Sequence, residues 1–481
     1  MENKSSSEQS QYALPLSLRY NLSVADAVPS QKNISQFLAS NASTFTPANN
    51  TIRIPVGSPT FLDLNSALLQ LTVKNTSGQV ANLDGGADGL IRRCRIIGSD
   101  GSTIEELHEY GLLSSVLDQY TSSSGKRNVD SILKGAPKYS DETCEYASSG
   151  GGTNTVTNRG ITITGATAGA MTLASIGGIG YDQTQSDQLN DGVSRQYLFS
   201  LKLGLFNMSA NRLLPPNTNF TLELQLNDAA NCIVTSATPA YEVSSVELHV
   251  PSVVINDSDF NQRIAARMAQ GMVFKTNTYQ HFVNTTADGG TSDVVQISAR
   301  ARSLKALMSI FRIQTNVSLS TAYSLSRRSI QYLDNYQYRL GAQSFPLDRV
   351  NVKCTGTAVA GGTLVNVLPI KKADTNINIS EAYSQALRVM GSVNNPGADI
   401  LIGKQSFAGS ELMNGTGICS VDLSAYSDAS VNSGISTLSN MPVSFEFQKN
   451  GESNGVLQID TYSVVEMTVV RDSSGVLTSF I

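Results

Sequence analysis

The side chains that most often carry out chemistry in proteins are few and widely separated in this sequence. Its three histidines, His108, His249 and His281, have no second metal ligand at the spacing that one helix or one hairpin would supply. No Gly-X-Ser-X-Gly elbow occurs, and no cysteine has a base beside it, so neither kind of nucleophile is indicated. We expect the histidines to be packing or surface residues.

Two glycine-containing segments match ion-binding loops only in part. Gly125 and Lys126 lack the upstream glycine and the following hydroxyl residue of a phosphate-binding loop. The run Asp84-Gly-Gly-Ala-Asp88-Gly could offer two carboxylates to calcium, but it lacks the other ligand positions of a calcium loop. Glycine and aspartate are common in tight turns, so both segments are predicted to be turns.

Paired carboxylates are the remaining candidates for acid–base chemistry. Glu105 with Glu106, and Asp257 with Asp259, are each placed at the predicted first turn of a helix, where negative charge opposes the helix macrodipole. This structural role accounts for both pairs. We therefore predict no catalytic, cofactor-binding or metal-binding residues, no cofactor, and a protein that is not an enzyme.

Three arginine clusters could contact either nucleic acid or protein: Arg92-Arg93-Cys-Arg95, Arg300-Ala-Arg302 and Arg327-Arg328. Aromatic residues do not alternate with these arginines, the formal net charge is −5, and the N-terminal segment is not rich in Lys or Arg. We expect no direct sequence-specific binding to nucleic acid. Contacts with neighbouring subunits, where arginine is favoured over lysine, are the preferred interpretation.

Composition favours an all-β protein large enough for two or three domains. Ser, Thr, Asn and Gly are abundant, and charged residues make up only 15% of the 481 residues. The five cysteines are scattered and odd in number, which indicates reduced thiols rather than a disulfide framework. The sequence begins without the features of a signal peptide, and no run of about 18 apolar residues could span a bilayer.

Short alternating runs, separated by turn residues, predict many strands and few helices. Strands are expected at 51–56, 67–74, 90–97, 196–205, 219–226, 241–250 and 457–471. Helices are expected at 104–117, 257–271 and 377–391, the last two ending in glycine. Between 121 and 194, dense Gly, Ser and Thr predict a long excursion with short β segments of its own. This pattern is typical of sandwiches and barrels.

The second half of the sequence faintly repeats the first. In each half a strand–turn–strand pair is followed by an arginine-bearing strip that ends in glycine, and then by a helical segment led by tyrosine. The matching pairs are 50–75 with 291–312, Arg95-Ile-Ile-Gly98 with Arg339-Leu-Gly341, and 110–120 with 383–390. A period of about 240 residues is far longer than a solenoid repeat, so the order of the matches predicts two copies of a whole domain.

These features divide the sequence into four parts. Residues 1–44 are predicted to be an extended arm, whose alternating apolar residues at 13–22 could add to another sheet. Two domains, 45–250 and 272–481, are then expected on either side of a linker helix at 251–271.

The sequence resembles the double jelly-roll major capsid proteins of icosahedral DNA viruses. The strands of the first half that carry the resemblance are 60–75 and Leu201-Lys-Leu-Gly-Leu-Phe206, with Leu213-Leu-Pro-Pro-Asn217. In the second half, Tyr336-Gln-Tyr-Arg-Leu-Gly-Ala-Gln-Ser-Phe-Pro346 is similar to the family's tyrosine, arginine and glycine strip before a proline. The resemblance extends over 45–471 and is nearest to the polinton-like viruses of algae and protists, with virophages and giant viruses more distant.

The resemblance implies two tandem eight-stranded jelly-roll barrels, with a few short helices in loops and linker. It implies a homotrimer of pseudo-hexagonal outline that tiles an icosahedral shell, with neighbouring capsomers, penton and minor capsid proteins as partners. The protein would be located in the virion after assembly in the host cytoplasm or nucleus. Loops 121–194 and 391–416 would face outward, and the arm would lie at the inner base of the shell. Because the arm lacks positive charge, minor proteins or an inner membrane would face the DNA.

Two other classes of function stay open. Jelly rolls also serve as carbohydrate-binding or adhesive modules, such as fibres and lectins, which usually present exposed aromatic residues, above all Trp, to sugar rings. This sequence contains no Trp. A jelly-roll enzyme would need a metal or a pair of acids that we do not find. A trimer would favour the capsid hypothesis, and a stable glycan-binding monomer would favour the adhesive module.

Overall fold

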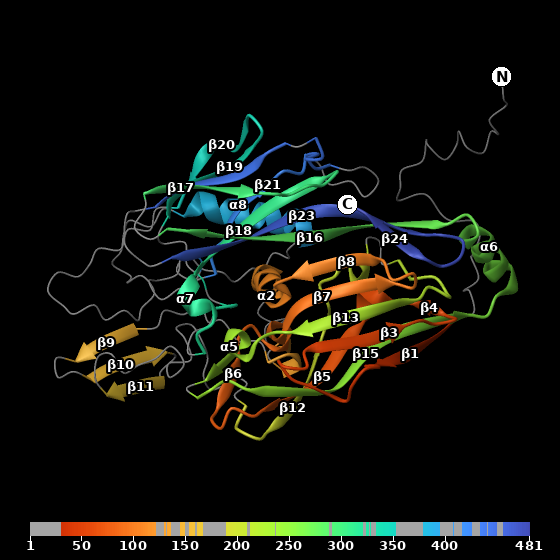
Figure 1. Cartoon of the computed structure of the whole chain (residues 1–481), viewed down its shortest axis with the longest axis horizontal. Helices are drawn as coiled ribbons and strands as arrows, with labels where there is room; N and C mark the ends of the chain where they lie inside the picture. Colours follow the sequence, from red (N-terminus) through yellow and green to blue (C-terminus); the bar gives the residue numbers. More distant parts are fainter. Residues whose placement is uncertain are drawn as a thin grey trace, which may run out of the picture.

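The computed structural model describes most of the chain between residue 30 and the C-terminus. The described residues are 30–121, 129–130, 132–135, 145–149, 153–158, 161–166, 189–208, 212–235, 237–287, 291–320, 324–326, 328, 333–352, 379–394, 407, 416–425, 433–439, 441–449 and 456–481. Antiparallel strands predominate in them, and the strands gather into two groups (Figure 1). The predicted all-β fold is confirmed.

The first group consists of two four-stranded ladders packed face to face around an apolar core. One ladder has the order β1 (Ser30–Leu38), β15 (Tyr241–Ile255), β5 (Leu68–Asn75) and β12 (Ser194–Phe199). The other has the order β3 (Thr51–Val56), β13 (Phe220–Leu226), β7 (Ile91–Gly98) and β8 (Thr103–His108). Buried residues alternate along β5, as expected for a strand with one face on a core.

The second group has the same construction. One ladder has the order β16 (Met272–Thr286), β23 (Leu457–Arg471), β18 (Leu304–Ile313) and β21 (Cys419–Asp422). The other has the order β17 (Ser292–Ile297), β22 (Val443–Lys449), β19 (Leu333–Leu340) and β20 (Gln343–Asn351). The short strand β24 (Leu477–Phe480) extends the first of these ladders beside β23.

The two groups are copies of one topology. When the eight long strands of each group are numbered in chain order, both groups have one ladder of order 1-8-3-6 and one of order 2-7-4-5. This is the jelly-roll arrangement, so each group is a roll, and the prediction of two tandem eight-stranded jelly rolls is confirmed. The repeat seen in the sequence corresponds to equivalent strands, because β3 and β5 have the same positions in the first roll as β17 and β18 have in the second.

Each roll inserts a helix between its fifth and sixth strands. These helices are α2 (Tyr110–Thr121) and α8 (Ser380–Asn394), which confirms the two tyrosine-led helical segments. The bounds expected for the second, 377–391, are wrong, because α8 begins at Ser380 and continues past Gly391 to Asn394. The excursion that follows α2 contains a three-stranded sheet of its own, as predicted. Its strands are β9 (Glu145–Ser149), β10 (Thr153–Asn158) and β11 (Ile161–Ala166).

Two expected elements are wrong in part. The helix expected at 104–117 begins only at Tyr110, because the residues before it form β8 and the chain turns at Glu109, whose φ is 47°. The three-residue spacing of Ile104 and Leu107 fits a helix, but pairing with β7 makes this segment a strand, with a register shift at Ile104. The strand expected at 196–205 ends at Phe199, and Gly204 lies in a short 3-10 turn, η4 (Gly204–Phe206).

The predicted arm and linker also need correction. Residues 30–38 of the predicted arm form β1, which pairs along its whole length with β15 of the same chain. The alternating segment 13–22 lies outside the described residues. The linker helix is shorter than predicted, since β15 continues to Ile255 and the helix is α6 (Ser258–Met268), capped by the carboxylate of Asp257.

The core of the second roll is aromatic. Phe445 on β22 lies 4.7 Å from the ring of Tyr338 and 5.9 Å from that of Phe311, measured between ring centroids. Phe445 is fully buried. These contacts join the facing ladders of the roll, because Phe311 belongs to β18 and the other two residues belong to the ladder β17–β22–β19–β20.

We predict that Phe445→Ala lowers the free energy of unfolding by about 3–5 kcal/mol, because it leaves a cavity between the two ladders. Chemical denaturation followed by fluorescence measures the change. Phe480→Ala is the matched control, since the side chain of Phe480 is 49% exposed, and should cost about 1 kcal/mol or less. Equal losses in the two variants would contradict this description of the core.

Candidate functional site

The two rolls meet in a buried junction rather than through the linker alone. β8 and α2 of the first roll lie beside β16 and the ladder that contains it (Figure 1). That ladder is buried on both faces. On β18, Leu307 and Phe311 point to the core of the second roll, whereas Met308 and Ile310 point to the first roll, and each is at most 1% exposed.

A buried carboxylate on β8 joins the rolls. Glu105 accepts hydrogen bonds from the backbone N–H of Gly204, at 2.8 Å, and from the hydroxyl of Thr278 on β16, at 2.6 Å. Burial raises the pKa of Glu105 to about 6, although these bonds oppose the rise. The backbone at Gly204 approaches β16 so closely that a Cβ there would lie 2.6 Å from the carbonyl oxygen of Asn277. Only glycine fits this contact.

The pairing of Glu105 with Glu106 at a helix start is therefore wrong. The two are neighbours in a strand, so their side chains point to opposite sides of β8. The predicted place of Asp257 and Asp259 at the start of a helix is confirmed in part, because Asp257 caps α6 by accepting the N–H of Phe260 at 2.9 Å.

A turn of the first roll receives a loop of the second. The carboxylate of Asp84 accepts the backbone N–H groups of Leu325, at 2.7 Å, and Ser326, at 3.0 Å. Gly85 and Gly86 follow with φ of 81° and 92°, so the predicted turn is confirmed. Burial raises the pKa of Asp84, against the effect of these bonds. Both carboxylate oxygens of Asp84 thus accept hydrogen bonds from protein donors. In the described part of the chain, no three His, Cys, Asp or Glu residues group as metal ligands.

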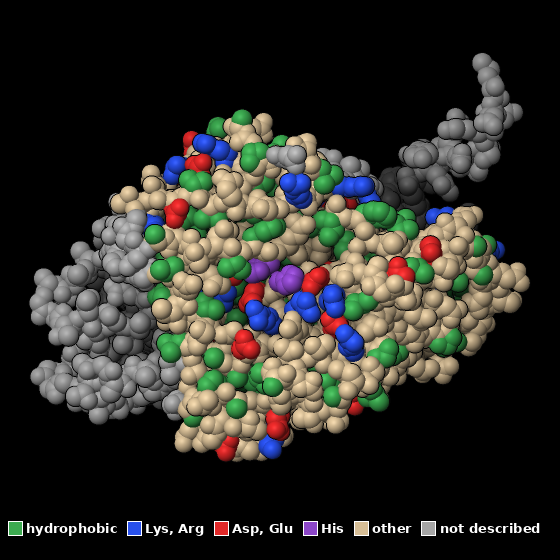
Figure 2. Space-filling view, viewed as in Figure 1, with side chains coloured by type: hydrophobic (Ala, Val, Ile, Leu, Met, Phe, Trp, Pro, Cys, Tyr) green, Lys and Arg blue, Asp and Glu red, His purple; other side chains and the backbone are tan. Residues whose placement is uncertain are grey.

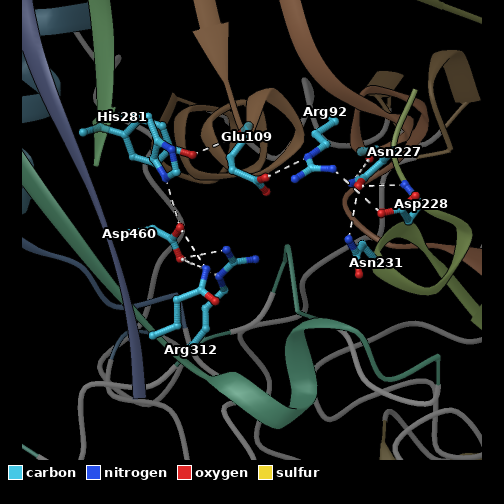
Figure 3. Close-up of polar contacts among 11 residues, drawn as sticks. Arg92, Glu109, Asn227, Asp228, Asn231, His281, Arg312 and Asp460 are labelled. Atoms are coloured by element: carbon cyan, nitrogen blue, oxygen red, sulfur yellow. Dashed lines mark hydrogen bonds and ion pairs between the residues drawn. The ribbon is translucent and has the colours of Figure 1, made fainter. Parts of the chain in front are cut away.

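A buried charge cluster lies on the second roll where it faces the first. Asp460 on β23 is ion-paired with Arg312 on β18, at 2.7 Å, and hydrogen-bonded to His281 on β16, at 3.0 Å (Figure 3). All three side chains are at most 6% exposed. Burial favours the neutral acid, but Arg312 and His281 outweigh it and hold the pKa of Asp460 below its ordinary value.

This cluster continues into the first roll. The hydroxyl of Tyr462 on β23, whose ring lies 4.8 Å from that of His281, donates to the carbonyl oxygen of Glu109 at 2.9 Å. The side chain of Glu109 is ion-paired in turn with Arg92, at 3.4 Å (Figure 3). A chain of polar contacts therefore crosses the junction.

The histidines lie on different elements and do not form one site. His281 belongs to the buried cluster, His249 lies on β15 at 3.2 Å from Glu247, and His108 lies on β8 at 3.6 Å from Glu106. Of the cysteines, the three described, Cys94, Cys232 and Cys419, are free and buried, and burial raises the pKa of the Cys94 thiol.

Arginines on and near β7, and on β19 and β20, form ion pairs within the chain. Glu223 on β13, whose side chain is only 3% exposed, accepts from Arg53 at 2.9 Å and from Arg95 at 2.5 Å. Burial would raise the pKa of Glu223, but these two bonds outweigh it and lower the pKa. In the second roll, Glu446 has a similar place on β22 between Arg339 and Arg349, each at 3.4 Å.

The preferred interpretation of 92–95 as a contact with other subunits is thus not supported, because its arginines have partners within the chain. Figure 2 shows acidic and basic side chains intermingled over the region of β7, β8 and β13. Arg328 is buried, and its Nε donates to the carbonyl oxygen of Thr416 at 3.3 Å. Arg302 lies over the ring of Phe480, at 6.0 Å from the ring centroid. Arg327 lies outside the described residues.

Sequence reasoning missed one buried cluster in the first roll. Lys134 donates to the carboxylates of Asp88, at 2.9 Å, and of Asp118 on α2, and Lys202 lies 3.0 Å from Asp118. Burial would lower the pKa of Lys134, but the two carboxylates outweigh it and raise the pKa. The four residues are far apart in the sequence, and no local pattern marks them.

We predict a pH dependence centred on Glu105. The pKa of Glu105 is raised from 4.5 to about 6 in the folded protein. The stability that its neutral form contributes is therefore fully present below the pKa of the unfolded state and is lost as pH rises through the pKa of the folded state. Relative to Glu105→Gln, the free energy of unfolding of the wild type should fall by about 2 kcal/mol between pH of about 4 and about 8. Denaturant titrations across this range measure it, with Glu106→Gln as the control for a carboxylate-to-amide change on β8. Parallel curves for wild type and Glu105→Gln would contradict the assignment.

We also predict that Asp460→Ala lowers the free energy of unfolding by about 3–5 kcal/mol, since it leaves the Arg312 guanidinium buried without its carboxylate. The double variant Asp460→Leu, Arg312→Met should recover most of this loss, because no charge stays buried. Asp259→Ala on exposed α6 is the control. A double variant that is no more stable than Asp460→Ala would contradict the prediction.

No protein-family model matches the chain, and no curated protein matches its sequence. Solved structures do match. The Faustovirus major capsid protein has a TM-score of 0.57 and 8% identity, over 95% of this chain and 93% of that one. PBCV-1 VP54, fitted into a reconstruction of the virophage Sputnik, has a TM-score of 0.55 and 9% identity over 96% and 98%. A chain of the Sputnik virophage has a TM-score of 0.54 and 11% identity over 98% and 92%. At such identities the likeness shows a common fold, the double jelly roll.

Proposed function

We propose that the chain is the major capsid protein of an icosahedral virus and forms homotrimers of pseudo-hexagonal outline. The observation that carries the proposal is the pair of rolls of one topology, held together by a buried junction. Two similar rolls per chain let three chains fill a six-fold position with nearly equivalent contacts. The structural likeness to the capsid proteins of Faustovirus and PBCV-1, over at least 93% of each chain, supports the same role.

In this proposal the chain is a building block and not an enzyme. Its units are a first roll at 30–255 and a second at 272–480, joined by α6. Its partners are two further copies, neighbouring capsomers, and penton and minor capsid proteins. Its place is the virion, after assembly in the host cytoplasm or nucleus. The strip 336–346, which is similar to the corresponding strip of the family, forms most of β19 and the start of β20. The nearest kinship with the polinton-like viruses is part of this proposal.

We propose no direct role in binding the genome. On the face that Figure 2 shows, acidic and basic side chains are intermingled, and the formal net charge is −5. Among the described residues, no helix is long and apolar enough to cross a membrane. Other proteins of the particle, or an inner membrane, would then face the DNA.

We predict that the purified chain has a molar mass of about three times 51.2 kDa by size-exclusion chromatography with light scattering. Negative-stain micrographs should show hexagonal outlines. A stable monomer that binds a glycan array would contradict the proposal and favour the carbohydrate-binding or adhesive module.

A further inference from the structure

The buried cluster around Lys134 brings one amine and two carboxyl groups into contact. The Nζ atom of Lys134 donates to Oδ2 of Asp118 on α2 and, at 2.9 Å, to Oδ2 of Asp88. The side chains of Lys134 and Asp88 are at most 5% exposed, and that of Asp118 is 12% exposed. An amine and a carboxyl group are the two reactants of an amide bond, and here they meet away from bulk water.

The backbone holds these groups in place. The carbonyl oxygen of Lys134 accepts the N–H of Ala87 at 2.8 Å, and Asp88 is the next residue, in the short 3-10 turn η3 (Ala87–Leu90). Asp118 lies on α2, which is buried along most of its length. Three segments that are distant in the sequence therefore meet at the Nζ atom. Reactants that a fold holds in contact in this way have a very high effective concentration.

The two oxygens of Asp118 have different partners. Oδ2 contacts Lys134, whereas Oδ1 lies 3.0 Å from the ammonium group of Lys202. The backbone N–H of Lys202 donates to the hydroxyl oxygen of Tyr110 at 3.0 Å, which fixes this segment. When an amine attacks a carboxyl carbon, one oxygen becomes an oxyanion, and a cation beside that oxygen stabilises it. Lys202 is placed to do this at Oδ1 while Oδ2 leaves.

Asp88 is placed to move protons. Its Oδ2 accepts from Lys134 and, at 2.6 Å, from the hydroxyl of Ser114. Among the described residues no donor reaches Oδ1 of Asp88, although this atom is buried, so it offers a site that can accept a proton. Lys134 is an ammonium ion at the start, and it becomes a nucleophile only after it has lost a proton. Asp88 is a base in contact with it.

We propose that Lys134 and Asp118 form an intramolecular isopeptide bond, with Asp88 as the group that transfers the protons. Asp88 takes one proton from the ammonium group, and the resulting amine attacks Cγ of Asp118. The bond between Nζ and Cγ forms, and the bond between Cγ and Oδ2 breaks. Oδ2 leaves as water with two of the three ammonium protons, both carried by Asp88, and the third proton stays on the amide. Nothing is oxidised or reduced, and no further reactant is needed.

Burial favours the amide over the ion pair. The charges of Lys134 and Asp118 are costly to keep out of water, and the amide removes both of them. The bond would tie the segment at Lys134 covalently to α2, the helix that the first roll places in the junction. The inference goes beyond the proposed function and does not depend on it, since a capsid role neither requires nor forbids the bond.

Intact mass spectrometry of the full, denatured chain tests the bond. We expect the wild type to be lighter than its sequence mass by one molecule of water. Lys134→Arg keeps the positive charge but has no amine that could be acylated, so it should have the full sequence mass. Lys305→Arg is the matched control, because Lys305 is also ion-paired with a buried carboxylate, Glu466, at 3.7 Å. This control should lose water as the wild type does.

A tryptic digest of the wild type locates the bond. It should contain a branched peptide that joins the segment of Asp118 to that of Lys134. The digest keeps the test decisive even if Lys134→Arg does not fold, because absence of the branched peptide would by itself overturn the inference. A wild type of full sequence mass would also overturn it, while the proposed function, tested by the mass of the assembly, would stand. So would a loss of water that persists in folded Lys134→Arg, because it would arise elsewhere.

Asp88→Asn tests the proton transfer. The amide keeps the size of the side chain but cannot take the proton, so the bond should form about 100-fold more slowly or less rapidly still. Freshly purified Asp88→Asn should therefore have mostly the full sequence mass, with circular dichroism as the check of its fold. Complete bond formation in this variant would overturn the role of Asp88.

Discussion

The contact between the first roll and the outer face of the ladder β16–β23–β18–β21 determines the relative orientation of the two rolls. A jelly-roll ladder needs one face on its own core, but this one is buried on both faces. On its outer side β8 lies beside β16, and Thr278 and Tyr462 of the ladder form hydrogen bonds across the junction. Because a buried acid or hydroxyl that lost its partner would cost on the order of 1–3 kcal/mol, the junction favours a single relative position of the rolls.

In the proposed capsomer, a fixed position of the rolls would give each chain a defined shape. Glu105, Asp84 and Tyr462 each form a hydrogen bond from one roll to the other. The connection through α6, a helix with no buried residues, could not by itself keep two rolls in a defined geometry. The buried charges of Asp460 and Arg312 are costly to desolvate, so we interpret them as contributing to the precision of the contact more than to stability.

Much of the fold could be predicted from the sequence, because strand alternation is local. β3 and β23 have the predicted bounds, and the repeated order of strands indicated two copies of one domain. The errors arose where contacts with a distant strand determine the secondary structure. The local sequence around Glu105 predicted a helix, but this segment pairs with β7 and forms a strand. The junction itself was not predictable, since Glu105 and Thr278 lie 173 residues apart and neither belongs to a motif. Arg93 and Arg95 could be recognised as charged residues, but their partner Glu223 could not be predicted, because it lies 128 residues after Arg95 in the sequence.

The measurement that tests the account most directly is a cryo-electron microscopy reconstruction of the purified assembly. We expect three chains around a threefold axis, with six rolls in a ring. A reconstruction in which the chain is monomeric, or in which the rolls do not surround a threefold axis, would contradict the account.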